Sequence, residues 1–281
     1  MKKSESVSTQ SKYAGYADYL IGFYGADRRI DTITPADAAM HKTWLATERI
    51  PVLVESTITR AIRAFRTFFT FAVDLCFIDC NPYKTLKVEK ERDETRVDYV
   101  SIEEVEQLIK FCKHPELKFI VALARLTGVR VPHEIMNLRF SDFHLDRAAS
   151  VFVIPHKTKT GMREIPFFSE LRPYFDLVKL QAKPEQEYVF EHYRRNGKNI
   201  GTLIRKARAK AGLRYWEKVF VNLRASRIIE LEEAQYPEST LDAIFGNTAE
   251  VRRRHYLKPR LLKQYSKVLA DSRITSVTLP Q

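Results

Sequence analysis

Four side chains far apart in the sequence, Arg130, Lys159, Arg224 and Tyr256, are of the types that can break a phosphodiester bond together. Two guanidinium groups can hold the oxygens of a phosphate and oppose the negative charge that builds on them. A lysine ammonium can protonate a departing oxygen, and a tyrosine phenol can attack phosphorus. Chemistry of this kind needs neither a metal ion nor ATP.

Each of these residues lies in a short motif of its own. The first arginine follows a Thr-Gly turn, the lysine lies on an expected hairpin, and the second arginine opens a helix. The tyrosine lies nine residues after Asn247. In chain order the motifs are Leu126–Arg130 with Glu134, Lys157–Pro166, Val221–Arg227 and Phe245–Tyr256.

In this order and with these gaps, the four motifs resemble the boxes of the tyrosine recombinase (phage integrase) family over about residues 10–270. The resemblance implies a mainly α protein with a small β-sheet, in which an N-terminal helical, SAM-like core-binding domain precedes a mostly helical catalytic domain. It implies a clamp around duplex DNA, and active protomers that assemble as a homotetramer on two DNA sites. The catalytic residues it implies are Arg130, Lys159, Arg224, Asn247 and the nucleophile Tyr256.

The chain departs from the family pattern at three points. Val221 stands where a histidine is usual, three residues before Arg224, and Asn247 replaces the usual His or Trp. One extra residue separates Arg130 from Glu134. Because valine cannot take a proton, the phenol proton leaves either to water or through His255.

The hairpin carries a second lysine, and this leaves its assignment open. Lys157 and Lys159 are two residues apart, so on a regular strand both would point the same way. We prefer Lys159 because it precedes Thr160-Gly161, as in the hairpin of the family.

Metal chemistry has little support in the sequence. Glu134 and Asp142 are too few for a two-metal nuclease, so we interpret them as an arginine-orienting carboxylate and a turn residue. The cysteines, Cys76, Cys80 and Cys112, are expected to be free thiols in a reducing compartment. We therefore expect no metal ligand and no cofactor.

The charge balance points to a polyanionic partner. The 281 residues include 47 Lys and Arg against 35 Asp and Glu, which gives a net charge of +12. Such an excess is typical of proteins that bind nucleic acid or an anionic membrane surface. Because no apolar stretch is long enough to span a membrane, we expect double-stranded DNA as the partner and a cytoplasmic, nucleoid-associated location.

Composition also divides the chain. Residues 84–97 are dense in charge and almost free of large apolar side chains, so they are predicted to be a linker. We expect a flexible arm at 1–11, a core-binding domain at 12–83, a catalytic domain at 98–270 and a C-terminal tail at 271–281.

Capping residues and hydrophobic spacing predict the elements. The N-terminal helices are expected to begin near Tyr13, at Pro35 and at Ser56, with the last of them reaching Ile78. The expected strands are Val151–Pro155 and Arg163–Phe167. The expected helices of the second domain are Val105–Cys112, Glu116–Thr127, Glu134–Leu138, Leu171–Gln181, Thr202–Ala211, Leu223–Ala234, Leu241–Phe245 and Val251–Tyr256.

Basic residues on two helices are candidates for contacts to the DNA backbone, which position a protein without specifying sequence. These are Arg60, Arg63, Arg66, Arg205 and Lys206.

The sequence as a whole favours a site-specific recombinase or integrase of a mobile element, with accessory DNA-bending or directionality proteins as possible partners. Two alternatives stay open. One is a DNA-binding relative that has lost its chemistry, and the other is a type IB topoisomerase.

Overall fold

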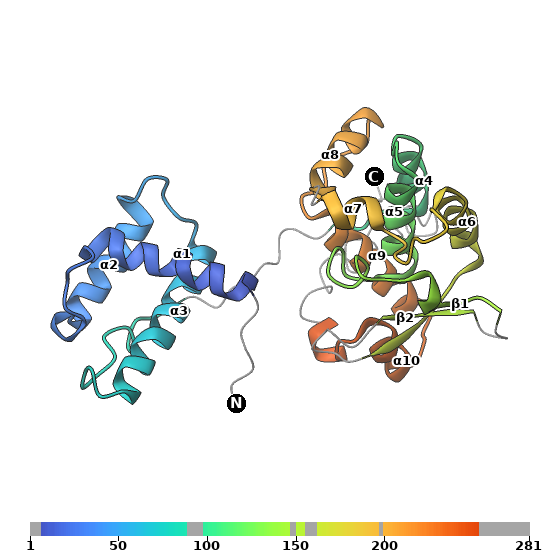
Figure 1. Cartoon of the computed structure of the whole chain (residues 1–281). Helices are drawn as coiled ribbons and strands as arrows, with labels where there is room; N and C mark the ends of the chain where they lie inside the picture. Colours follow the sequence, from blue (N-terminus) through green and yellow to red (C-terminus); the bar gives the residue numbers. More distant parts are fainter. Residues whose placement is uncertain (1–6, 89–97, 147–149, 155–161, 197–198, 253–281) are drawn as a thin grey trace, which may run out of the picture. The chain divides into compact units, whose positions relative to one another are not determined.

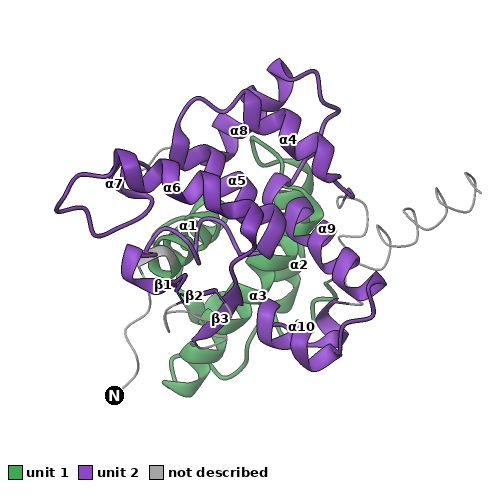
Figure 2. Cartoon of the chain, turned by 90° about the vertical axis from the view of Figure 1, so that its right-hand side faces the viewer, with its two compact units in different colours: residues 1–92 green, residues 93–281 purple. Residues whose placement is uncertain are grey.

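The computed structural model describes residues 7–88, 98–146, 150–154, 162–196 and 199–252. The chain divides into two compact units, residues 1–92 (unit 1) and 93–281 (unit 2) (Figures 1 and 2). Each unit has a hydrophobic core of its own. Both are mainly helical, and unit 2 adds a small antiparallel sheet, which confirms the predicted fold class.

Unit 1 consists of helices whose ends follow local chemistry. They are α1 (Val7–Tyr24), the 3₁₀ turn η1 (Ile30–Thr32), α2 (Pro35–Thr47) and α3 (Glu55–Asp74). The start of α2 is as predicted, because Thr34 accepts the Asp37 N–H while the Asp37 carboxylate accepts the Thr34 N–H. Helix α3 buries the expected apolar face, which includes Ile62 and Phe65.

Two boundaries of unit 1 differ from the predictions. Helix α1 begins at Val7, so part of the expected arm is helical, since each residue added to an existing helix gains a backbone hydrogen bond. Helix α3 ends at Asp74 and does not reach Ile78. Cys76 has a φ of 59°, and the N–H of Phe77 reaches back to the Ala72 carbonyl, which together close the helix.

A buried histidine lies at the centre of unit 1. His41 Nε2 donates to the Tyr19 carbonyl (3.1 Å), so Nδ1 accepts from the Tyr83 hydroxyl (2.7 Å). The Tyr83 and Tyr24 hydroxyl groups also form a hydrogen bond (2.9 Å). Burial lowers the pKa of His41 to about 4, so this ring is neutral at physiological pH.

Helix α5 is central in unit 2, where α4, α6 and α9 pack against it (Figure 1). It ends as predicted, because Gly128 caps it in the left-handed conformation, and it begins at Pro115, one residue before the expected Glu116. The helices of unit 2 are α4 (Ile102–Lys110), α5 (Pro115–Thr127), α6 (Arg172–Gln181), α7 (Glu191–Asn196), α8 (Ile200–Lys210), α9 (Val219–Glu233) and α10 (Glu238–Phe245), with 3₁₀ turns η2 (Phe140–Asp142) and η3 (Ser169–Leu171).

A buried ion pair fixes α9 against α5. Arg125 is fully buried; its Nε donates to the Val100 carbonyl (3.0 Å) and its Nη1 to Glu230 (2.9 Å). The Tyr99 hydroxyl donates to the same carboxylate (2.8 Å). These contacts hold the start of unit 2 against α5 and α9.

The sheet of unit 2 has the order β1-β2-β3 among the described residues, with β1 (Phe143–His144), β2 (Val151–Ile154) and β3 (Arg163–Pro166). Strands β2 and β3 form the predicted antiparallel pair, with Ile154 opposite Arg163 and Phe152 opposite Ile165. The tip that would join them, residues 155–161, lies outside the described residues. Helix α10 packs against β3 (Figure 2).

The predicted helix Glu134–Leu138 is wrong. Residues 131–137 form successive turns. The N–H groups of Glu134 and Met136 reach back four residues, but those of Ile135 and Leu138 reach back only three, so the bonds form separate turns and no continuous α-helical ladder.

Within the part of the chain that is described, no helix is long and apolar enough to cross a membrane.

Candidate active site

The end of α5 places Arg130 beside α10. Gly128, two residues earlier, has a φ of 67°, and a Cβ on it would lie 2.6 Å from Cε1 of Phe245. A glycine is therefore required both by the backbone conformation and by the close approach of the aromatic ring. Arg130 is exposed over 38% of its side chain, so its guanidinium is open to solvent on one side.

Glu134 holds two arginines at once. Its buried carboxylate lies 2.6 Å from Nη1 of Arg130 and 2.9 Å from Nη2 of Arg163. Burial by itself would raise the pKa of Glu134, but the hydrogen bond from the Arg130 N–H and the charges of both arginines outweigh it. The pKa of Glu134 is therefore lowered, and the group is a carboxylate at neutral pH.

Arg224 reaches the same place from α9. Its Nη1 donates to the Gly128 carbonyl and its Nη2 to the Phe245 carbonyl (2.6 Å). The guanidinium carbon lies 5.4 Å from the centre of the Phe245 ring. Because Arg224 is only 5% exposed, packing fixes its position.

The last residue of α10 and the two residues after it, which we call the α10 turn (residues 245–247), each accept a hydrogen bond from an arginine at the backbone carbonyl. Phe245 accepts from Arg163 (2.9 Å) as well as Arg224, Gly246 from Arg130 (3.5 Å), and Asn247 from Arg252 (2.7 Å). Cations at a helix C-terminus interact favourably with its unsatisfied carbonyl groups. We call Arg130, Arg163, Arg224 and Arg252 the arginine cluster.

Gly246 allows this convergence. Its φ is 59°, and a Cβ there would lie 2.0 Å from Nη1 of Arg163. Any other residue would therefore displace the guanidinium from the carbonyl it binds.

The cluster carries more positive than negative charge. Its four guanidinium groups face three carboxylates, since Glu134 pairs with Arg130 and Arg163, and Arg252 pairs with Glu232 and Asp242. Such a site favours an anion, and favours most a species whose negative charge increases, as at the phosphorus of a transition state.

The remaining predicted catalytic residues are only partly described. Lys159 and Tyr256, with the alternatives Lys157 and His255, lie outside the described residues. Asn247 lies in the α10 turn, and its side-chain oxygen is buried with no hydrogen-bond donor from the described groups.

Val221, at the usual histidine position, is 42% exposed on α9, one turn before Arg224. This side chain has no group that can accept the phenol proton.

The predicted DNA contacts lie in different surroundings. Arg60 and Arg63 are exposed on α3. Arg66, on the same helix, donates to the carbonyls of Tyr83 (3.0 Å) and Leu86, which gives it a structural role in unit 1. In unit 2, Arg205 and Lys206 are exposed on α8, where Arg205 also donates to Thr202.

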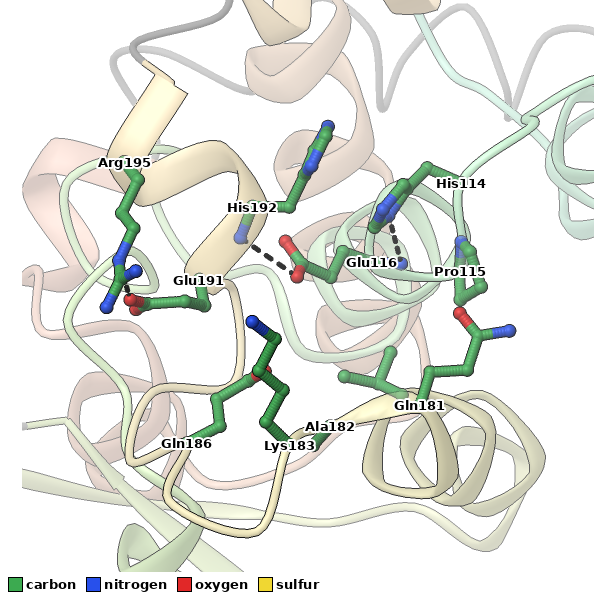
Figure 3. Close-up of a pocket in the computed structure, with 11 residues that line it drawn as sticks. His114, Pro115, Glu116, Gln181, Ala182, Lys183, Gln186, Glu191, His192 and Arg195 are labelled. Carbon is green, nitrogen blue, oxygen red and sulfur yellow. Dashed lines mark hydrogen bonds and ion pairs between the residues drawn. The ribbon is translucent and has the colours of Figure 1, made fainter.

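A separate cavity of about 280 Å³ lies between the start of α5, the end of α6 and α7 (Figure 3). Glu116 accepts the N–H groups of His192 (3.0 Å) and Tyr193 (3.3 Å), and burial raises its pKa. The rings of His114 and His192 stack at 4.1 Å. These contacts join α5 to α7, and no arginine of the cluster lines the cavity, so we assign it a structural role.

Among the described residues no group of three or more His, Cys, Asp or Glu side chains is arranged to hold a metal ion. Asp142 accepts the Arg139 N–H (2.8 Å) in η2, as expected of a turn residue.

Arg163 is the member of this site that motif reasoning missed. A signal was present, because on β3 it alternates in phase with the buried Ile165, and an arginine at an inward strand position requires a buried partner.

No family model and no curated protein sequence matches this chain. Solved structures do match its fold. A Tn1549 transposon integrase in complex with a circular intermediate DNA is 17% identical, over 94% of this chain and 95% of that one, with a TM-score of 0.70. A lambda integrase dimer bound to a COC′ core site is 18% identical, over 92% and 91%, also with a TM-score of 0.70. The chain thus has the fold of these integrases, as the four motifs predicted.

Proposed function

We propose that this chain, which shares the integrase fold, is a site-specific recombinase that breaks and rejoins double-stranded DNA through a 3′-phosphotyrosine intermediate. The observation that carries the proposal is the arginine cluster. The two arginines that the motifs single out, Arg130 and Arg224, converge on one turn just before the segment that contains Tyr256. The solved integrases with this fold are bound to DNA.

In the proposed first step, the Tyr256 oxygen forms a bond to phosphorus while the bond from phosphorus to the 5′ oxygen breaks. Lys159 supplies the proton that the departing 5′ oxygen takes up, and the phenol proton passes to water or through His255. In the second step, a 5′-hydroxyl of another strand attacks the phosphotyrosine and releases the tyrosine. The phosphodiester energy is kept, so neither ATP nor a metal ion is required.

Arg130, Arg224 and Asn247 are proposed to bind the non-bridging oxygens. Their donors oppose the charge of the five-coordinate phosphorus, and loss of one such donor typically lowers a rate on the order of 10²–10³-fold. The exposed edge of Arg130 supports this role.

For the assembly, we propose a homotetramer on two DNA sites, with accessory DNA-bending or directionality proteins acting on the same DNA. The net charge of +12 supports a DNA partner, and a cytoplasmic, nucleoid-associated location follows from that partner.

A second candidate is a DNA-binding protein of the same fold that does not cleave DNA. Val221 favours this function, because an exposed aliphatic side chain stands where a histidine could accept a proton. A type IB topoisomerase would share the covalent step but would not exchange strands between two duplexes. Recovery of recombinant duplexes from two differently labelled sites distinguishes the proposal from a topoisomerase.

The covalent step can be tested on DNA selected by the protein itself. Duplexes enriched from a randomised pool are nicked at successive positions, so that a cut beside the nick traps the intermediate. We expect an SDS-resistant adduct with the wild-type chain and none with Tyr256→Phe, at similar DNA affinity. Tyr236→Phe, at a tyrosine that is 53% exposed in unit 2, is the matched control and should form the adduct. An adduct with Tyr256→Phe would show that the nucleophile is misassigned.

A further inference from the structure

We infer that Arg163 is a positioning residue, which holds the phosphate-binding Arg130 and the α10 turn in one arrangement. The inference rests on the proposed function for its catalytic consequence, and on the contacts of the described residues for its geometry. No motif of the sequence singled this arginine out.

Arg163 is held between two parts of the site. Its Nη2 lies 2.9 Å from Oε2 of Glu134, and its Nη1 donates to the Phe245 carbonyl (2.9 Å). Its side chain is 5% exposed, and the Glu134 side chain is fully buried. Both of these contacts are with protein groups, so we assign the influence of Arg163 on the reaction to these two neighbours.

The first neighbour is Glu134, which shares its carboxylate between Arg163 and Arg130. One oxygen of the carboxylate faces Nη1 of Arg130, and the other accepts the Arg130 N–H and faces Arg163. Without Arg163, the carboxylate keeps its charge in a buried site but loses one of its two cations. It is then free to turn toward Arg130 or to take up a proton, and either change moves the guanidinium that binds phosphate.

The second neighbour is the α10 turn. Arg163 and Arg224 donate to the same Phe245 carbonyl, and Gly246 leaves room for the Arg163 guanidinium. In the sequence, Arg163 also comes four residues after Lys159. One side chain thus links the first arginine, the second arginine and the turn that leads toward Tyr256.

Misplacement of a reacting group by about 1 Å can cost on the order of 10²-fold in rate. We therefore expect Arg163→Ala to slow adduct formation at saturating nicked DNA about 10–100-fold while DNA affinity changes little. Arg163→Lys, which keeps the charge and one contact, should recover part of the rate.

The matched control is Arg125→Lys, because Arg125 is another buried arginine with a carboxylate partner and lies outside the arginine cluster. It should lower thermal stability without slowing the adduct rate at temperatures where the chain is folded. An effect that merely reflects a damaged core would appear in both variants.

A double-mutant cycle distinguishes a role of Arg163 through Arg130 from a general contribution to the stability of the fold. If Arg163 acts through Arg130, the two effects are not additive, and Arg163→Ala should cost less than about threefold in an Arg130→Ala background. Full additivity of the two losses would overturn the inference.

A readout that does not require cleavage keeps the two proposals apart. The guanidinium N–H signals of Arg130, assigned by comparison with Arg130→Lys, should show restricted rotation in the wild-type chain and lose it in Arg163→Ala but not in Arg125→Lys. If the wild-type chain forms no adduct while this signal depends on Arg163, the proposed function fails and the positioning role stands. If the adduct forms and Arg163→Ala changes neither its rate nor the Arg130 signal, the positioning role is overturned.

Discussion

Lys157 and Lys159 compete for one chemical role, and the leaving group can decide between them. A 5′-bridging phosphorothiolate leaves as a thiolate of low pKa, so it needs no general acid. We expect Lys159→Ala to be slow on ordinary DNA and to regain near wild-type cleavage on the phosphorothiolate, in a single-turnover assay.

Lys157→Ala is the matched control for this experiment, since it removes the same charge two residues away. It should cleave both substrates like the wild-type chain. If instead only Lys157→Ala regains cleavage on the phosphorothiolate, and Lys159→Ala cleaves both substrates equally well, Lys157 is the general acid.

Gly246 offers a second test at the level of one residue. Gly246 and Gly212 both have a left-handed backbone, with φ of 59° and 65°, but only at Gly246 would a Cβ meet another group. Alanine in this conformation costs about 1–2 kcal/mol. Gly246→Ala also displaces Arg163 from a charge-assisted hydrogen bond, which contributes about 1.5–3 kcal/mol.

Urea unfolding of both variants measures the difference. Gly246→Ala should lose at least about 1 kcal/mol more stability than Gly212→Ala. Equal losses would mean that the Arg163 contact to the α10 turn contributes little to stability.

The sequence predicts a residue's role best where that role depends only on its own segment. Gly128 was expected to end α5 because a turn requires a permissive backbone, and the structure confirms it. For Arg163 the strand alternation indicates only a buried position, and for Gly246 the local pattern indicates only a helix end. Their roles arise where β3 meets α10, and a contact between distant segments cannot be read from either segment alone.

At the level of elements, α3 makes a prediction about DNA binding. Arg60 and Arg63 are exposed on this helix. If each contacts a phosphate, each alanine substitution should flatten the slope of log affinity against log salt by about one unit, because one counterion fewer is released. All DNA sequences should be weakened alike, as measured by fluorescence anisotropy over a salt series.

Arg29→Ala is a suitable control, since Arg29 is an exposed arginine of unit 1 already paired with Asp31 (2.7 Å). Its salt slope should match that of the wild-type chain. Unchanged slopes for both α3 variants would place the DNA-binding face of unit 1 elsewhere.

The boundaries of helices that carry capping residues were predicted better than those of elements without them. Thr34 as the N-cap gave the start of α2, where the structure shows a full capping box. Ser101 and Glu104 also form a capping box, but α4 begins at Ile102, three residues before the expected Val105. The end of α3 was missed because Cys76 adopts a conformation usually left to glycine. The short β1 and α7 carry no periodic pattern long enough to recognise.

At the scale of the whole molecule, the two units have separate cores and should respond differently to acid. The pKa of His41 in folded unit 1 is about 4, against an ordinary value of 6.5. Since the folded pKa is depressed, the unfolded chain binds the proton more tightly. Stability is therefore intact above the ordinary pKa and is lost as the pH falls toward 4. The expected loss for unit 1 between pH 7 and pH 5 is about 2 kcal/mol.

Hydrogen exchange of amides in α2 and α3, followed by mass spectrometry, can measure this in the full chain. His41→Gln removes the titration and should flatten the pH dependence, even though it weakens the unit. His133→Gln, at an exposed histidine of unit 2, should leave the pH dependence of α2 and α3 unchanged. A pH dependence that survives His41→Gln would assign the acid sensitivity to other groups.

The tight fit of glycine against arginine also limits how this sequence can evolve. A Cβ at position 246 would lie 2.0 Å from Nη1 of Arg163, so a larger residue there is excluded as long as the arginine keeps its contact with the Phe245 carbonyl. A shorter residue in place of Arg163 removes this clash, but it also removes the contacts by which we infer that Arg163 positions Arg130. A selection for restored activity from Gly246→Ala should therefore recover glycine at position 246 and not changes at position 163.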